Sequence, residues 1–294
     1  MSNFGGPNSR FEKSYNAKFI KLNAKLKTLE NQLVAILSNP SHVADAKILR
    51  TNAYWNAMRV QINQVYRDMD KAFAGWIKKE LPLRYRQSLR NIQARIETTK
   101  GIANTAQKSI TGMVKSTGTN QIVTGLVADA NITYKQALLA GKNNVERFTR
   151  ATQQVLVNER LVDATVAEAF NLGNLRKGAQ ALQNIIEGEL LDGFAEHHFV
   201  QAGSRKFSPS YYAEMVTRTK FHDAQSIAAL AQANNYDTDL VQVSSHNTKT
   251  PICLPFEAKI FSVSGKDKRF PPLTETSPYH PNCLHLMFPT FVES

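Results

Sequence analysis

The chain of 294 residues is 42% hydrophobic and 20% charged, with a formal net charge of +12 at pH 7. This length is sufficient for one large domain or two smaller ones, and the hydrophobic content is sufficient to form a core. The composition therefore excludes a disordered chain. Residues 1–10 show no apolar stretch behind a basic start, and the longest apolar run nearby, residues 33–37, is far shorter than the roughly 18 to 20 residues of a membrane span. We therefore expect neither a signal peptide nor a membrane anchor.

Positive charge is concentrated in the first half of the sequence. Residues 1–150 hold 24 basic and 9 acidic side chains (net +15), residues 151–200 hold 3 and 7, and the remainder holds 9 and 8. The sequence has only two cysteines, Cys253 and Cys283, which excludes a fold held together by several disulfides. One disulfide bridge between these two residues is possible. Synthesis in a reducing cytosol is expected.

Apolar residues near the N-terminus recur at alternating steps of four and three, which is the seam of a helix packed in coiled-coil fashion. The series is Tyr15, Phe19, Leu22, Leu26, Leu29, Leu33 and Ile36. A break at residues 39–41 follows, because proline cannot continue a helix and serine can cap the next one.

The same rhythm returns over residues 48–76 and again over residues 85–96, with Pro82 predicted to interrupt the chain between them. Residues 1–100 are therefore predicted to be a basic, coiled-coil-like helical region, an elongated hairpin or bundle with an intramolecular seam.

The next segment, residues 101–120, is rich in Gly, Ser, Thr and Asn and predicts a flexible linker or loop. Helical patterns resume over residues 121–139, 144–170 and 175–199, with a turn at 171–174. Residues 121–207 are therefore predicted to be a helical middle region.

A small C-terminal module is predicted over residues 208–294. Ser208 and Pro209 begin a helix in the favoured order of cap and proline, and it should run to about Ala233 before Asn234-Asn235 ends it. Short β-like runs follow at residues 240–244 and 259–263. The predicted fold is mainly α: an elongated N-terminal helical hairpin or bundle, further helices, and this small α+β module.

Cysteine and histidine side chains gather in this module. Structural zinc takes four such ligands in a tetrahedron. The predicted ligands are His246, Cys253, Cys283 and His285, with His280 as an alternative. A buried pair of free cysteines, or histidines that only bond to backbone carbonyls, would give the same pattern.

Several short motifs carry a family resemblance over residues 208–291. They are Arg218-Thr219 on a helix, Cys253 at the end of a polar turn, Lys259-Ile260-Phe261 on a strand, and His280-Pro281-Asn282-Cys283 followed by His285. This segment resembles the C-terminal domain of minor capsid or head-morphogenesis proteins of tailed bacteriophages, of the Mu F-like type.

Three positions depart from that family pattern. Thr250 stands where many members have the first cysteine of CxxC, Ala258 replaces the usual glycine, and Leu284 replaces the arginine of the NCRC or NCRH ending. If zinc binds, either His246 replaces the missing cysteine or the site is incomplete.

The resemblance implies a non-enzymatic minor capsid protein, made in the host cytoplasm and located in the virion, inside the capsid near the portal. It would assist head assembly, DNA packaging or ejection, in several copies per particle. The implied partners are the portal protein, the major capsid protein, or both, and double-stranded DNA bound without sequence preference.

Cations at the end of the second apolar stripe and along the third are the predicted DNA contacts, because basic side chains on a helix face release counterions from phosphates. They are Lys78, Lys79, Arg84, Arg86, Arg90 and Arg95. An ordinary solvated helix face is the alternative reading of the same residues.

No catalytic motif stands out in the sequence. Cys283 with His280 or His285 is a candidate pair of nucleophile and general base. A cysteine between prolines in a segment like residues 277–291 is, however, typical of a structural role. Glu196-His197-His198 lacks the histidine spacing of HExxH. The alternatives left open are a phage-borne enzyme or effector delivered with the DNA, and a host DNA-binding helical protein.

Overall fold

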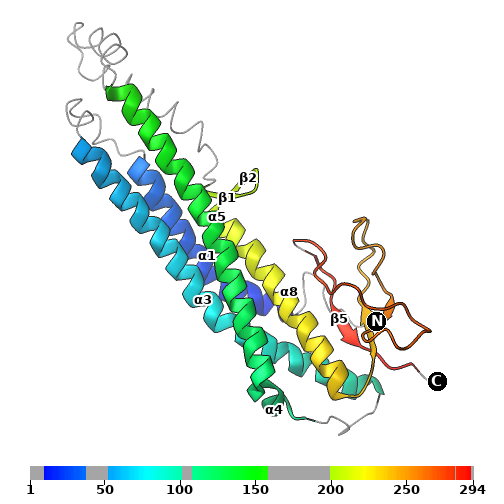
Figure 1. Cartoon of the computed structure of the whole chain (residues 1–294). Helices are drawn as coiled ribbons and strands as arrows, with labels where there is room; N and C mark the ends of the chain where they lie inside the picture. Colours follow the sequence, from blue (N-terminus) through cyan, green and yellow to red (C-terminus); the bar gives the residue numbers. More distant parts are fainter. Residues whose placement is uncertain (1–9, 38–51, 101–107, 158–198, 282, 293–294) are drawn as a thin grey trace, which may run out of the picture. The chain divides into compact units, whose positions relative to one another are not determined.

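The computed structural model describes residues 10–37, 52–100, 108–157, 199–281 and 283–292. The helices are α1 (Arg10–Leu37), α3 (Asn52–Lys100), α4 (Ile110–Lys115), α5 (Thr117–Val157) and α8 (Pro209–Asn235) (Figure 1). The strands are β1 (Val200–Ala202), β2 (Arg205–Phe207), β3 (Leu240–Val243), β4 (Ile260–Ser262) and β5 (Met287–Pro289). The predicted fold class, mainly α with a small α+β module, is confirmed.

Packing divides the chain into two compact units, each made of segments that are distant in sequence. Unit 1 comprises residues 1–20, 74–132 and 214–294, and unit 2 comprises residues 21–73 and 133–213. The predicted regions are consecutive along the chain, whereas these units interleave, and α1, α3, α5 and α8 each contribute residues to both.

The seam predicted near the N-terminus is buried in α1. The side chains of Phe19, Leu22, Leu26, Leu29 and Leu33 are at most 7% exposed. Their spacing keeps one stripe of the helix on the core side over its described length, as a coiled-coil period requires.

The predicted interruption at Pro82 is wrong, because α3 is one continuous helix with this proline inside it. A proline in a helix interior loses one backbone hydrogen bond and costs about 3 kcal/mol. The apolar stripe continues across it: Ile77, Leu81, Tyr85 and Leu89 are at most 2% exposed. Burial on both sides of the proline offsets the local cost.

The predicted linker is helical from Ile110 onward, and residues 101–107 lie outside the described part of the chain. Its serines act as caps: Ser109 Oγ accepts from Gly112 N at 3.2 Å, and Ser116 Oγ accepts from Thr119 N at 3.3 Å. Small polar residues are weak helix formers but good caps, so the composition was misleading here.

Helix α5 also runs unbroken across residues 140–143, where the sequence pattern separated two helices. The helix predicted over residues 175–199 and the turn before it lie outside the described residues up to 198. From Val200 the chain instead forms an antiparallel hairpin, in which Val200 pairs with Phe207. Gly203, at φ 61°, occupies the turn, where a positive φ favours glycine.

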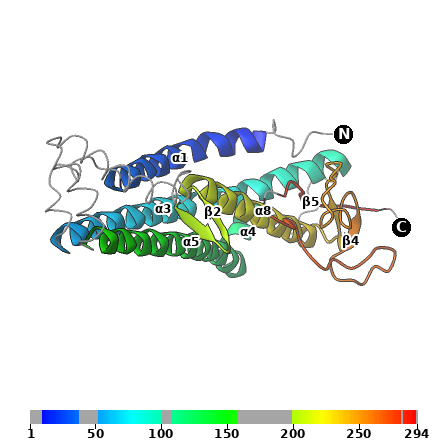
Figure 2. The same cartoon turned by 90° about the horizontal axis from the view of Figure 1, so that it is seen from above.

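The C-terminal module is built on α8 and a three-stranded sheet; the sheet and α8 from Glu214 onward belong to unit 1. The start of α8 at Pro209 and the strands within residues 240–244 and 259–263 are confirmed, while β5 was not predicted. Strand β3 is central and pairs antiparallel with β4 and β5. Gln225 Nε2 donates to the Met287 carbonyl at 2.7 Å, so the sheet is anchored on α8 (Figure 2).

Among the described residues, no helix combines the length and the apolar character of a membrane span.

Candidate metal centre and basic surface

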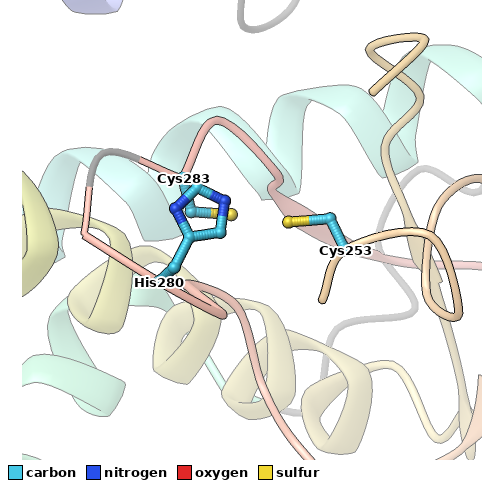
Figure 3. Close-up of side chains that lie close together, drawn as sticks. All are labelled: Cys253, His280 and Cys283. Carbon is cyan, nitrogen blue, oxygen red and sulfur yellow. The ribbon is translucent and has the colours of Figure 1, made fainter. Parts of the chain in front are cut away.

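Cys253, His280 and Cys283 come together beside the C-terminal sheet. Their sulfur and ring-nitrogen atoms all lie within 4.8 Å of one another. Figure 3 shows the sulfur atoms of the two cysteines pointing toward each other, with the imidazole of His280 beside Cys283. Both cysteines are free thiols and are at most 2% exposed.

Two backbone turns present these cysteines. In the turn between β3 and β4, Cys253 N donates to the Thr250 carbonyl at 2.9 Å, and the Cys253 carbonyl accepts from Phe256 N at 3.0 Å. In the turn before β5, Cys283 N donates to the His280 carbonyl at 3.1 Å. Proline follows Thr250 and His280 directly and stiffens both turns.

His285 adjoins the three-residue cluster. Its Nδ1 lies 3.4 Å from Cys283 Sγ, and its side chain is buried. Two ligands of one tetrahedral zinc, with Zn–S of about 2.3 Å and Zn–N of about 2.0 Å, stand about 3.5 Å apart. The observed separation therefore suits a shared metal ion.

The far side of the His285 ring faces a carboxylate. His285 Nε2 is buried, has no hydrogen-bond partner among the described residues, and lies 3.9 Å from Glu257 Oε1. Metal-bound histidines commonly direct their second nitrogen to a carboxylate, which fixes the ring. Glu257 is held in turn by the backbone N–H groups of His246 and Thr248. No sequence motif pointed to Glu257.

His246 occupies a supporting position instead of joining the cluster. Its Nε2 is 2.8 Å from Ser244 Oγ, and its ring packs edge-on against that of His285, with centroids 5.1 Å apart. The structure thus brings together the two predicted cysteines and the alternative ligand His280. The ligand set itself stays a prediction.

Burial sets the protonation of the site. It raises the pKa of Cys253 to about 11, and the neighbouring Cys283 and Glu257 add to the rise. Burial lowers the pKa of His285, and it lowers the pKa of His222, which lies nearby on α8, to about 4. Neutral imidazoles and thiols that only a cation would ionise are suited to metal ligation.

The same features oppose nucleophilic catalysis. Cys283 is 2% exposed and out of reach of a substrate, and a raised pKa leaves Cys253 protonated at neutral pH. Asp223, next to His222, is paired with Lys220 at 2.8 Å. The Glu196-His197-His198 motif lies outside the described residues.

The predicted DNA contacts divide between two faces of α3. Lys78, Lys79, Arg86 and Arg90 are exposed and form what we term the α3 basic face. Lys79, Arg86 and Arg90 follow steps of seven and four residues, so their side chains lie on one side of the helix.

Arg84 and Arg95 point toward the core of unit 1. Arg84 is 2% exposed, with its guanidinium carbon 5.3 Å from the centre of the Phe221 ring, and Arg95 stacks over Phe288 at 4.0 Å. The two arginines are three helical turns apart, so they share a side of α3. The six predicted DNA contacts therefore do not share one exposed face, and Arg84 packs in the core of unit 1.

Comparison with protein families gives a match over most of the chain. The sequence profile of the family described as phage minor capsid protein 2 matches residues 27–294. No curated protein and no solved structure matches the chain. The match confirms the resemblance to phage minor capsid proteins and extends it from residues 208–291 into the helical region.

Proposed function

Because the chain belongs to the phage minor capsid protein 2 family, we propose that it acts inside the phage head, close to the portal, where it contacts the packaged DNA. It is a bacteriophage minor capsid protein by family, and such a protein is structural. In this proposal it assists head assembly, packaging or ejection, and several copies contact the portal protein, the major capsid protein, or both.

The α3 basic face is the observation that carries the DNA contact. It presents four exposed cations within residues 78–90, and the first 150 residues carry a net charge of +15. Cations in such a row bind phosphates without reading bases, because each releases counterions from the duplex. A DNA-filled particle supplies such a partner at high concentration.

We predict that the full-length protein binds duplex DNA in a salt-dependent manner through this face. Replacement of Lys79, Arg86 and Arg90 by Gln should reduce the slope of log affinity against log salt by about 3, since each lost phosphate contact removes about 0.9. Fluorescence anisotropy with a labelled duplex measures this slope.

The matched control for that variant removes the same charge from the C-terminal module. Lys249, Lys259 and Lys266 are exposed there, and their replacement by Gln should leave the slope unchanged. Equal effects of the two triple variants would show that only net charge matters, and the α3 basic face would then have no special role.

The proposed location inside the head is tested separately, by locating the protein in purified particles. Its absence from the head interior would contradict the proposal.

The metal cluster is proposed to be a structural zinc site formed by Cys253, His280, Cys283 and His285. Two observations support this proposal. The ligand atoms of Cys253, His280 and Cys283 all lie within 4.8 Å of one another, and His285 Nδ1 lies 3.4 Å from Cys283 Sγ. Zinc would cross-link the turn between β3 and β4 to the turn before β5, and its binding free energy would add to that of folding. A small sheet of three short strands has little core of its own, so such a link is useful there.

This site predicts about one zinc per chain. Metal analysis of protein purified under reducing conditions should find it in the wild type and not in Cys283→Ser, and a chelator should lower the melting temperature of the wild type only. His280→Gln should also lose zinc, whereas His246→Gln should retain it.

Two results would overturn the zinc site. One is zinc retained in Cys283→Ser. The other is an intact mass two hydrogens lower than expected for the wild type in the absence of a reductant, which would indicate a Cys253–Cys283 disulfide.

A further inference from the structure

A groove of about 460 Å³ lies between α3 and α5 within unit 2 and is lined by basic side chains from both helices. Arg67 and Lys71 contribute from α3, one turn apart, and Lys135 and Lys142 contribute from α5, two turns apart. Among the described residues that line it, Asp70 is the one carboxylate. The groove therefore has four cations against one anion.

Most of these cations lack a compensating charge. Lys142 Nζ lies 2.9 Å from Asn63 Oδ1 and 3.4 Å from Glu146 Oε1, so its charge is already shared. Arg67 donates to the neutral Gln64 side chain at 2.7 Å. Lys71 and Lys135 are exposed and form no ion pair with any residue that the structure describes. Arg67, Lys71 and Lys135 thus have no ion-pair partner among the described residues and remain available to an anionic ligand, with Asp70 as the one opposing charge in the lining.

The floor of the groove is apolar and held in place. Leu138 is 2% exposed, and the buried Tyr66 hydroxyl donates to the Phe199 carbonyl at 2.9 Å. An apolar floor supports the aliphatic stems of the lysines while their ammonium groups reach solvent. The cations are therefore presented from a preformed surface, which lowers the entropic cost of binding.

We propose that this groove, which no sequence motif indicated, binds the phosphodiester backbone of duplex DNA. This inference rests on the proposed function and adds a second contact surface to it. Cations on two walls, spaced by one and two helical turns, suit a ligand with regularly repeated charges, and duplex DNA carries one charge per about 1.7 Å of its axis.

The test neutralises the two unpaired lysines in the full-length protein. In Lys71→Gln/Lys135→Gln, the slope of log affinity against log salt should fall by about 2, so the affinity gap to the wild type should shrink about tenfold between 50 and 200 mM salt. Lys25 and Lys27 are exposed on α1 in the same unit, and their replacement by Gln is the matched control, expected to change nothing. Circular dichroism checks that the variants are folded.

The outcomes separate this inference from the proposed function. If the wild type binds duplex DNA and the Lys71/Lys135 variant behaves like the control, the groove inference is overturned while DNA contact through the α3 basic face stands. If the wild type binds no duplex at any salt concentration, the proposed DNA contact itself fails. If poly-glutamate competes as well as DNA at equal charge and loses this ability in the Lys71/Lys135 variant, the groove recognises acidic protein, and the assignment to DNA is wrong.

Discussion

Ala258 adopts φ 61°, in the left-handed region where a Cβ crowds the backbone. It closes the turn that carries Cys253, and its carbonyl accepts from Gln242 Nε2 at 3.3 Å. Glycine would adopt this conformation without strain.

Ala258→Gly is therefore expected to stabilise the protein. The substitution relieves about 1 to 2 kcal/mol of backbone strain in the folded state. It also increases the entropy of the unfolded chain, which costs about 0.4 to 1 kcal/mol. The free energy of unfolding should therefore rise by about 0.5 to 1 kcal/mol. Denaturant unfolding measures it. As a control, Ala94→Gly at an exposed position in α3 should cost about 1 kcal/mol. A loss of stability in both variants would contradict the proposed strain at Ala258.

Helix α5 meets the hairpin of unit 2 at Gly141. A Cβ placed there would lie 1.9 Å from the Phe199 carbonyl oxygen and 2.7 Å from the carbonyl carbon. The same carbonyl accepts the Tyr66 hydroxyl, so it is held from a second side. This close approach, and not helix propensity, explains a glycine in the interior of a helix.

Gly141→Ala is expected to lower stability by about 1 to 3 kcal/mol, because the backbone of the hairpin must shift to admit the methyl group. Gly125, in the same helix, has no heavy atom near the position of a Cβ, so Gly125→Ala should raise stability by about 1 kcal/mol. Thermal unfolding compares the two variants. A stabilising effect of Gly141→Ala would show that the hairpin does not pack against α5 in this way.

At the scale of the whole molecule, the DNA-binding proposals make a joint quantitative prediction. The α3 basic face presents four cations and the groove presents three without a compensating charge. At about 0.9 per phosphate contact, the wild-type salt slope should be about −6 if both surfaces bind and about −4 if only the α3 basic face binds. The net charge of +12 alone does not distinguish these cases, since only contacting cations release counterions.

Much of the fold could be predicted from local pattern. The apolar stripes of α1 and α3, the cap and proline that start α8, and the short runs that became β3 and β4 each depend on neighbours a few residues away. The failures at Pro82 and in the predicted linker have one cause. Burial and capping, which composition does not show, outweighed intrinsic propensity there.

The residue types of the candidate site were determined by the sequence alone: two cysteines, several histidines and proline-stiffened turns in one module. Only the tertiary structure decided that His280 joins the cysteines while His246 packs against His285, and that Arg84 and Arg95 stack on rings while Arg86 and Arg90 face solvent. The groove between α3 and α5 also emerged only from the structure. A helical or strand period is a local property, whereas the direction in which a side chain finds a partner depends on residues far away along the chain.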